Sequence, residues 1–136
     1  MREGPIVVLG FGRSGTTWIS DIISKGTGGL ILFEPFHPCV APVAETLAYS
    51  HDDESGRLQA HLDDLLNKRI REKWLLRNHI PVSLDEVSDH LVNMVWEDCT
   101  TLGFKEIRAN FLINWFLDNL YANVVFVIRH PCATIA

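Results

Sequence analysis

The side chains best suited to chemistry are concentrated in the stretch GFGRSGTTW, at residues 10–18. Its glycines allow the backbone to wrap around an anion, and amides at the start of a following helix point toward the oxygens of that anion. Gly10 and Gly15 have the spacing of a nucleotide-binding loop, but Thr16 stands where such a loop carries lysine. The loop's cation is Arg13, whose guanidinium can hold an oxyanion through two parallel hydrogen bonds.

The alternative to an anion site is a tight turn from strand to helix that binds no ligand. Such a turn needs fewer hydrogen-bond donors than this loop offers. In an NTPase the missing lysine reaches the β- and γ-phosphates, so this loop is poorly arranged for ATP with magnesium. The sequence therefore predicts a site for a different phosphate-like group, with donors from Arg13, Ser14, Thr16 and Thr17.

Basic residues also follow two apolar runs elsewhere in the chain. Arg129 comes directly after NVVFVI, and Lys105 stands near the end of TLGFKEI. In open α/β sheets, ligands bind at the carboxyl ends of the strands. Arg129 is therefore a candidate for holding a second phosphate, with a helix cap or a surface ion pair as the alternative. Lys105 and Arg108 either face the same crevice or are ordinary solvated charges.

The elements that must position these residues alternate between strands and helices. Apolar runs predict strands, and helical spacing or capping signals predict helices. The alternation indicates an α/β domain over residues 1–136 with a mostly parallel sheet flanked by helices. The section of residues 41–99 is nearly all helical and is expected to be an insertion that covers the ligand-binding edge. The expected strands are 5–9, 30–34, 101–107 and 123–128, and the expected helices are 16–25, 41–50, 57–78, 83–99 and 110–120.

The net charge, the apolar runs and the cysteines of the chain argue against several classes of protein. The formal net charge of -5 argues against non-specific binding of nucleic acid, which depends on clustered positive charge. No apolar run approaches the roughly 20 residues that span a membrane, and a strand begins within five residues of the N-terminus, so we expect neither a membrane span nor a signal peptide. The three cysteines have no metal-binding spacing, suit a reducing, cytoplasmic compartment and are expected to be buried.

Two of these motifs resemble a known family. GRSGTTW resembles the 5′-phosphosulfate loop of sulfotransferases that use 3′-phosphoadenosine 5′-phosphosulfate (PAPS), and VVFVIRHPCATIA is similar to their 3′-phosphate segment. The resemblance covers residues 5–136 and implies a fold like that of the P-loop-containing nucleoside triphosphate hydrolases. It implies that Trp18 lies near the adenine and that Arg129 holds the 3′-phosphate. The 5′-phosphosulfate would be held by Arg13, Ser14, Gly15, Thr16 and Thr17.

The resemblance also bears on where the chain stops. The family pairs the arginine at position 129 with a serine eight residues later, which would follow Ala136. The chain ends as a helix begins after Pro131. We therefore expect a fragment, the N-terminal part of such a domain.

The same resemblance suggests a general base. The cytosolic branch of the family uses a histidine in a segment that corresponds to KEIR here, and this histidine is absent. LILFEPFHP resembles the branch that acts on carbohydrates and protein tyrosines, which implies Glu34 as the base. Its position after an apolar strand is expected to raise its pKa. Alternatively, Glu34 pairs with an arginine such as Arg13 and only orients it, and His37 is the reserve candidate.

The leading interpretation is a PAPS-dependent sulfotransferase that acts on a small-molecule or carbohydrate hydroxyl. Arg13 and Lys105 would stabilise charge and Glu34 would remove the proton, with no metal ion. The alternatives are a P-loop kinase or NTPase and a non-catalytic adenine-nucleotide-binding module. The sequence leaves the oligomeric state open.

Overall fold

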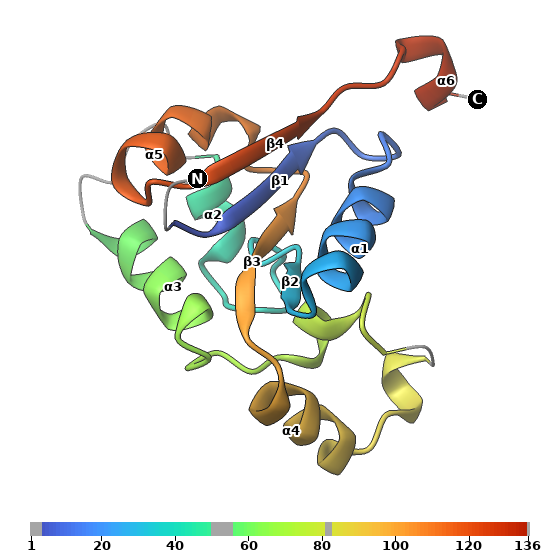
Figure 1. Ribbon diagram of the computed structural model, residues 1–136. Coiled ribbons are helices and arrows are strands. Elements are labelled where there is room, and N and C mark those ends of the chain that lie inside the picture. The colour runs from blue at the N-terminus through green and yellow to red at the C-terminus, as the bar shows by residue number, and fades with distance from the viewer. Residues whose placement is uncertain (1–3, 50–55, 81–82, 136) are drawn as a thin grey trace.

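The computed structural model describes residues 4–49, 56–80 and 83–135, and shows an α/β architecture (Figure 1). Within this part, the sheet has four strands, all parallel, in the order β2-β3-β1-β4. The predicted α/β class with a parallel sheet flanked by helices is confirmed. Because the strands are parallel, their carboxyl ends meet at one edge of the sheet. The strands are β1 (Ile6–Gly10), β2 (Leu30–Phe33), β3 (Thr101–Glu106) and β4 (Asn123–Val127).

The two inner strands, β1 and β3, meet at a position where a side chain does not fit. Val7, Val8 and Leu9 of β1 are fully buried, as expected for a strand covered on both faces. Ile6 pairs with Gly103 of β3, and a Cβ atom at Gly103 would lie 1.8 Å from the Ile6 carbonyl oxygen. Glycine is therefore required by this close approach, which aligns the ends of β1 and β3.

The first helix, α1 (Thr16–Thr27), follows the glycine-rich loop and packs on β1, β2 and β3. It continues two residues beyond the predicted end at position 25. Gly28, rather than Gly26, takes the left-handed conformation that ends the helix, with φ of 74°, and its N–H donates to the carbonyl of Ser24.

The prediction of one long helix over residues 57–78 is wrong. Helix α3 (Arg57–Leu66) ends after ten residues, and Lys68 then adopts a left-handed φ of 57°. The Lys68 side chain donates to the carbonyls of Trp96 and Cys99, which fixes the turn. The chain resumes in the 3₁₀ helix η1 (Lys73–Leu76). The apolar spacing was still informative, because Leu58, Leu62 and Leu65 are fully buried and Leu66, Ile70 and Trp74 are partly buried against the core.

Three other predicted helices are shorter than expected. Only α2 (Ala44–Ala48) forms within 41–49, the described part of the range predicted as 41–50. The capping-box pattern of Ser83 and Glu86, which predicts a helix start, is followed only by the 3₁₀ turn η2 (Leu84–Glu86). The helix α4 (Asp89–Asp98) begins later, and Ser88 caps it by accepting from the Leu91 N–H. Asn110 is a residue type that often caps helices, and it was expected to cap the helix predicted to end at position 120. Instead it begins the 3₁₀ turn η3 (Asn110–Leu112), which leads into α5 (Ile113–Asn119).

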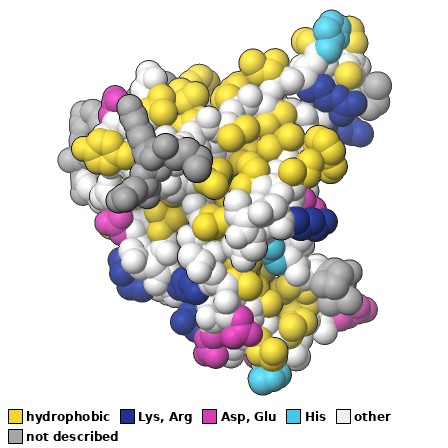
Figure 2. Space-filling model, viewed as in Figure 1, with side chains coloured by type: hydrophobic (Ala, Val, Ile, Leu, Met, Phe, Trp, Pro, Cys, Tyr) yellow, Lys and Arg dark blue, Asp and Glu magenta, His cyan; other side chains and the backbone are white. Residues whose placement is uncertain are grey.

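The fourth strand is only partly buried, although the apolar run NVVFVI predicts a strongly buried strand. In the described part of the chain, β4 pairs only with β1 and forms an edge of the sheet. Val125 and Phe126 are each 37% exposed, and Ile128 is 82% exposed. Hydrophobic side chains gather on this face of the molecule (Figure 2), and the chain runs on into α6 (Pro131–Ile135).

The cysteines also differ from the expectation of burial. Cys39 and Cys132 are exposed and Cys99 is half-buried, and all three are free thiols. Among residues 4–49, 56–80 and 83–135, no helix combines the length and the apolar character needed to cross a membrane.

Candidate functional site

The glycine-rich loop connects the end of β1 to the start of α1. The Ser14 N–H donates to the Phe11 carbonyl across 3.1 Å, which closes the turn. Gly15 has a φ of 99° and Arg13 a left-handed φ of 62°. Such a backbone is strained for arginine, and strain of this kind is frequent at functional sites. The Ser14 hydroxyl is buried and has no hydrogen-bond partner in the described part of the chain.

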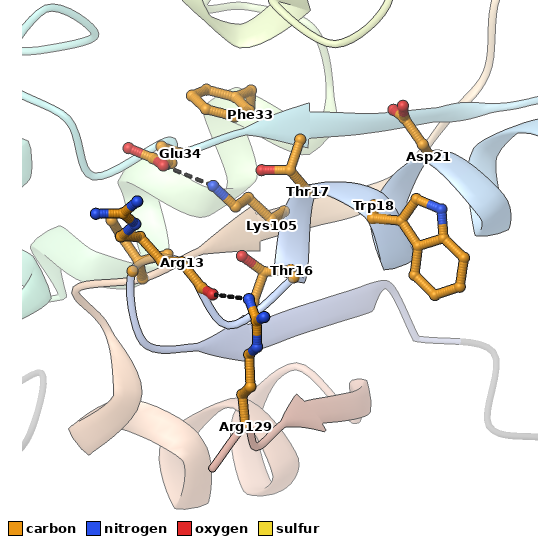
Figure 3. Close-up of a pocket in the computed structure, with 12 residues that line it drawn as sticks. Arg13, Thr16, Thr17, Trp18, Asp21, Phe33, Glu34, Lys105 and Arg129 are labelled. Atoms are coloured by element: carbon orange, nitrogen blue, oxygen red, sulfur yellow. Dashed lines mark hydrogen bonds and ion pairs between the residues drawn. The ribbon is translucent and has the colours of Figure 1, made fainter. Parts of the chain in front are cut away.

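A cavity of about 650 Å³ opens between this loop and the carboxyl ends of β2 and β3 (Figure 3). The residues predicted to bind the donor or take part in transfer line it, with the exception of the buried Ser14, whereas Arg108 and the reserve base His37 do not. The sequence did not point to Gly12, Asp21, Phe33 or Ile107. The described residues that line it are Gly12, Arg13, Gly15, Thr16, Thr17, Trp18, Asp21, Phe33, Glu34, Lys105, Ile107 and Arg129.

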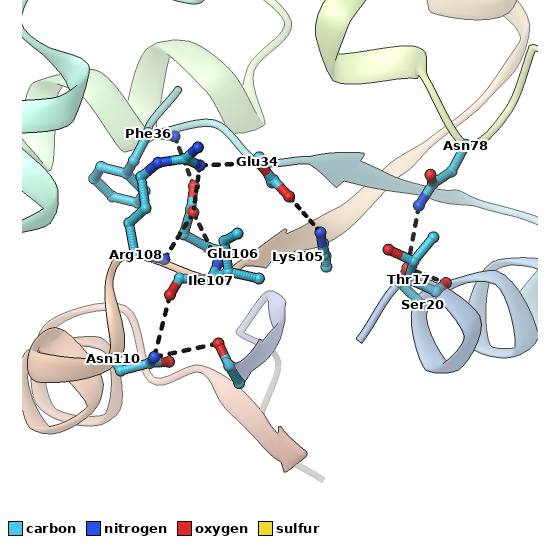
Figure 4. Close-up of polar contacts among 11 residues, drawn as sticks. Thr17, Ser20, Glu34, Phe36, Asn78, Lys105, Glu106, Ile107, Arg108 and Asn110 are labelled. Carbon is cyan, nitrogen blue, oxygen red and sulfur yellow. Dashed lines mark hydrogen bonds and ion pairs between the residues drawn. The ribbon is translucent and has the colours of Figure 1, made fainter. Parts of the chain in front are cut away.

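Glu34 lies between two cations from the next strand and the loop after it (Figure 4). Lys105 Nζ is 2.6 Å from Glu34 Oε1, and Arg108 Nη1 is 2.9 Å from Glu34 Oε2. Burial of the carboxyl raises its pKa, but the hydrogen bonds and charges of Lys105 and Arg108 outweigh burial, so the pKa of Glu34 is lowered. The predicted rise is therefore wrong, because an apolar strand end was considered without its neighbours. The expectation of a pair with an arginine holds for Arg108, rather than Arg13.

Glu106 is a buried carboxyl that sequence reasoning missed. Its Oε2 accepts from the Phe36 N–H at 2.9 Å, and its Oε1 accepts from the N–H groups of Ile107 and Arg108 at 2.8 and 3.0 Å. Burial raises the pKa of Glu106, and these hydrogen bonds offset only part of the rise. Glu106 thus ties the loop after β2 to the loop after β3. Its place at the end of an apolar run was the only available signal.

Lys105 is a buried charge at the floor of the cavity. Its side chain is 3% exposed, and its ammonium lies 4.1 Å from the centre of the Phe33 ring. A cation over an aromatic face gains electrostatic stabilisation, which increases when the pair is desolvated. Lys105 therefore faces the crevice, whereas the alternative of a solvated charge does not describe it.

Arg129 lies on the opposite side of the loop from Glu34. Its Nη1 donates to the Arg13 carbonyl at 3.2 Å, so the end of β4 and the glycine-rich loop are in direct contact. The guanidinium has five N–H donors, and the side chain is exposed at the cavity. Arg129 can therefore contact the loop and an anion at the same time.

His37, the reserve candidate for the base, does not line the cavity. Its ring stacks on Trp74 with centroids 4.0 Å apart, and its Nδ1 accepts from the Cys39 N–H at 3.2 Å. These contacts assign His37 a structural role in the loop after β2.

The described parts of the segment 41–99 support the cavity wall rather than cover its mouth. None of the described residues of this segment lines the cavity, which corrects the expected placement for that part of the chain. Trp74 packs edge-on against Phe33 with centroids 5.5 Å apart, and Arg77 lies over the same ring at 5.4 Å. Asn78 donates to Ser20 of α1 at 3.3 Å. The segment thus fixes one side of the cavity by holding Phe33 and α1.

Comparison of the chain with protein-family models, with curated proteins and with solved structures found no match. The chemistry of the site is therefore argued from its residues. Among the described residues, no three His, Cys, Asp or Glu side chains are grouped so that they could hold a metal ion. The arrangement combines an amide-rich loop, cations on both sides of it and one carboxylate at the cavity floor, which suits a polyanion and a proton transfer.

Removal of the Glu34 charge should lower stability in a pH-dependent way. In Glu34→Gln, Lys105 stays buried without its anionic partner, so we expect a loss of about 3 kcal/mol in the free energy of unfolding at pH 7. The pKa of Glu34 is lowered from 4.5 in the folded state, so its contribution is complete above pH 4.5 and is lost as the pH falls through the folded-state value. Urea unfolding of both proteins between pH 7 and pH 3 measures the difference. A difference that does not shrink below pH 4.5 would contradict this pairing.

Proposed function

We propose that the chain is a PAPS-dependent sulfotransferase with a P-loop type of nucleotide-binding fold, which transfers a sulfonate group to an acceptor hydroxyl. The observation that carries the proposal is the meeting of Arg13, Arg129 and the Glu34–Lys105 pair around one cavity. The sequence resemblance of GRSGTTW and VVFVIRHPCATIA to the donor-binding segments of this family points the same way.

The residues of the cavity fit a nucleotide with phosphates at both ends of its ribose. The loop offers Arg13, the hydroxyls of Thr16 and Thr17 and the first amides of α1 to a 5′-phosphosulfate. Arg129 offers a second positive charge to a 3′-phosphate. Trp18 is 67% exposed at the cavity rim, where its ring can stack on a base. When bound, PAPS supplies a sulfonate group on a phosphate leaving group.

Glu34 and Lys105 have different proposed roles in the transfer step. Glu34 is placed to accept the proton of an acceptor hydroxyl, and Lys105 is placed to stabilise negative charge on the transferred group. At rest the two side chains neutralise one another across 2.6 Å. An anion that draws Lys105 toward itself weakens that pair, which raises the pKa of Glu34 and makes it a stronger base.

The absence of charge at Thr16 disfavours the kinase or NTPase alternative. In those proteins a lysine at this position reaches the terminal phosphates of ATP. The nearest buried lysine in this cavity is Lys105, which comes from β3 and is paired with Glu34. A non-catalytic nucleotide-binding module would use the same loop, and only a transfer assay separates it from an enzyme.

A thermal-shift comparison tests the proposed ligand. At a ligand concentration of about 100 times Kd, adenosine 3′,5′-bisphosphate should raise the melting temperature by roughly 8 °C, whereas ATP with magnesium should have little effect. The reason is that the loop has no lysine for a triphosphate, while Arg129 offers a site for a 3′-phosphate.

Arg129→Ala serves as the matched control for the 3′-phosphate. In this variant the shift with the bisphosphate should fall to the value measured with adenosine 5′-monophosphate. Preference of the wild-type protein for ATP with magnesium would overturn the sulfotransferase proposal in favour of the kinase alternative.

A further inference from the structure

Glu106 is a buried carboxyl to which the proposed transfer step assigns no role. It is the last residue of β3, next to Lys105, and its side chain is 0% exposed. An ionised carboxyl is costly to bury unless hydrogen bonds and charges compensate for the lost water. The contacts of Glu106 reach the loop after β2 and the loop after β3, on both sides of the Glu34–Lys105 pair (Figure 4).

This one carboxyl group bridges the ends of two strands. Glu106 Oε2 accepts from the Phe36 N–H at 2.9 Å, and Glu106 Oε1 accepts from the Ile107 N–H at 2.8 Å. Phe36 lies two residues after Glu34, and Ile107 lies two residues after Lys105. Hydrogen bonds to a charged acceptor are stronger than those between neutral groups. Glu106 therefore limits how far the loop that carries Glu34 can move away from the strand that carries Lys105.

The backbone of Glu34 needs such a restraint. Its φ is 42°, in the left-handed region that residues with a side chain rarely adopt. A backbone of this kind persists only where the surrounding structure holds it. At Glu34 itself, the N–H donates to the Lys105 carbonyl at 2.8 Å. Two residues later, the Phe36 N–H donates to Glu106. The turn that directs the Glu34 side chain is thus held at both ends.

Glu106 also holds the second cation that contacts Glu34. Its Oε1 accepts from the Arg108 N–H at 3.0 Å and lies 3.4 Å from Arg108 Nη1. The same Nη1 atom lies 2.9 Å from Glu34 Oε2. Because both the backbone and the guanidinium of Arg108 contact Glu106, the guanidinium is held in place beside the candidate base.

We propose that Glu106 is a positioning residue for the transfer step, which holds the Glu34 carboxylate between Lys105 and Arg108 and in place to accept the proton of the acceptor. The inference rests on the proposed sulfotransferase function. Glu106 is not among the described residues that line the cavity, so its effect on the reaction is indirect. It acts through the Phe36 N–H on the loop that carries Glu34, and through Arg108 on the carboxylate itself.

Glu106→Asp tests this role, because it keeps the charge and shortens the side chain by one methylene group. The shorter carboxyl cannot reach the Phe36 N–H and the N–H groups after β3 at the same time. We expect kcat for sulfonate transfer to fall by about 10- to 100-fold, since a displacement of about 1 Å can cost roughly 10²-fold in rate. The KM for PAPS should change little, because the proposed donor contacts come from the glycine-rich loop and Arg129.

The titration of Glu34 is a readout that a loss of stability alone would not change. Burial raises the pKa of Glu34, but Lys105 and Arg108 outweigh burial and hold it below its usual value. Looser contact with these cations in Glu106→Asp should raise that pKa toward its usual value. The acid limb of kcat/KM should then move to higher pH, because the base is active only when deprotonated. Carbon-13 NMR of the Glu34 carboxyl measures the same shift without turnover.

Val92→Ala is the control for stability. Val92 is a buried core residue of α4 outside the cavity, so its truncation lowers stability without removing a contact of Glu106. It should leave the Glu34 titration and kcat, measured well below its melting temperature, at the wild-type values.

Glu106→Gln is the second variant, in case Glu106→Asp does not fold. It keeps the shape of the side chain, but its NH₂ group cannot accept from an N–H. One of the two loops is therefore released, and kcat should fall to a similar extent.

A wild-type kcat in either folded variant, or an unchanged Glu34 titration in Glu106→Asp, would overturn the positioning role. If the wild-type chain itself transfers no sulfonate, the proposed function fails instead. The Glu34 titration then still decides whether Glu106 holds Glu34 against its two cations. A higher Glu34 pKa in Glu106→Asp supports that hold, and an unchanged pKa overturns it.

Discussion

Glu34→Gln is expected to lower the rate of sulfonate transfer by roughly 10²–10⁴-fold, the usual contribution of a placed general base. Glutamine has nearly the same shape and cannot accept the proton of the acceptor. The carboxylate lies 7% exposed at the cavity floor, and its two oxygens are held by different cations, so its position is fixed before any ligand binds. The measurement is single-turnover transfer with saturating PAPS and acceptor.

The same variant needs a check on binding, because Glu34 also contributes to stability. Adenosine bisphosphate should raise the melting temperature of Glu34→Gln by as much as it raises that of the wild-type protein. The transfer rates should be compared at a temperature well below the melting point of the variant. Glu45→Gln is a suitable control, since Glu45 is an exposed carboxylate on α2 outside the cavity. Transfer at the wild-type rate by a folded Glu34→Gln would eliminate Glu34 as the base.

Lys105→Met is the second change with a large expected effect. It keeps most of the side-chain volume against Phe33 and removes the charge that is placed to stabilise the transferred group. Removal of one such donor usually costs 10²–10³-fold in turnover, so we expect a loss of roughly that size. Single-turnover transfer measures it, and Lys73→Met, which breaks an exposed pair with Asp89 outside the cavity, is the matched control.

Lys105→Met should also change the pH dependence of the reaction. Lys105 helps to hold the pKa of Glu34 below its usual value, so its removal raises that pKa. The base is active only when deprotonated, and the acid limb of kcat/KM should therefore move to higher pH. An acid limb that does not move, together with a full loss of rate, would assign Lys105 to charge stabilisation alone. An unchanged rate would contradict its role altogether.

The general class of the fold could be predicted because the signals are local. Short apolar runs such as IVVLG and LILF, separated by helical spacing, are typical of buried parallel strands. Arg13, Glu34, Lys105 and Arg129 each stand at or just beyond the end of such a run. Because parallel strands end at one edge, their joint location at the cavity followed from the topology.

The pairing within the site could not be predicted, because it depends on strand order. Glu34 and Lys105 are 71 residues apart and meet only because β2 lies next to β3. Because the sequence does not reveal the strand order, Arg13 was an equally good candidate partner for Glu34. The direction of the Glu34 pKa shift was wrong for the same reason, since two of its neighbours come from β3 and the loop that follows it.

Helix ends in the segment 41–99 were also beyond sequence reasoning. The spacing of Leu62, Leu65 and Ile70 continues past the real end of α3, because both a helix and a chain that folds back can bury such residues. The turn at Lys68 depends on carbonyls of Trp96 and Cys99, about 30 residues away in sequence. Tertiary contacts of this kind override local propensity.

The most direct test of the central claim is transfer of a radiolabelled sulfonate group from PAPS to a mixture of small-molecule and carbohydrate hydroxyl acceptors. The account predicts a labelled ester with the wild-type chain and at least roughly 10²-fold less ester with Glu34→Gln. Absence of any labelled ester from a folded chain that binds adenosine bisphosphate would contradict the sulfotransferase assignment and leave a nucleotide-binding module.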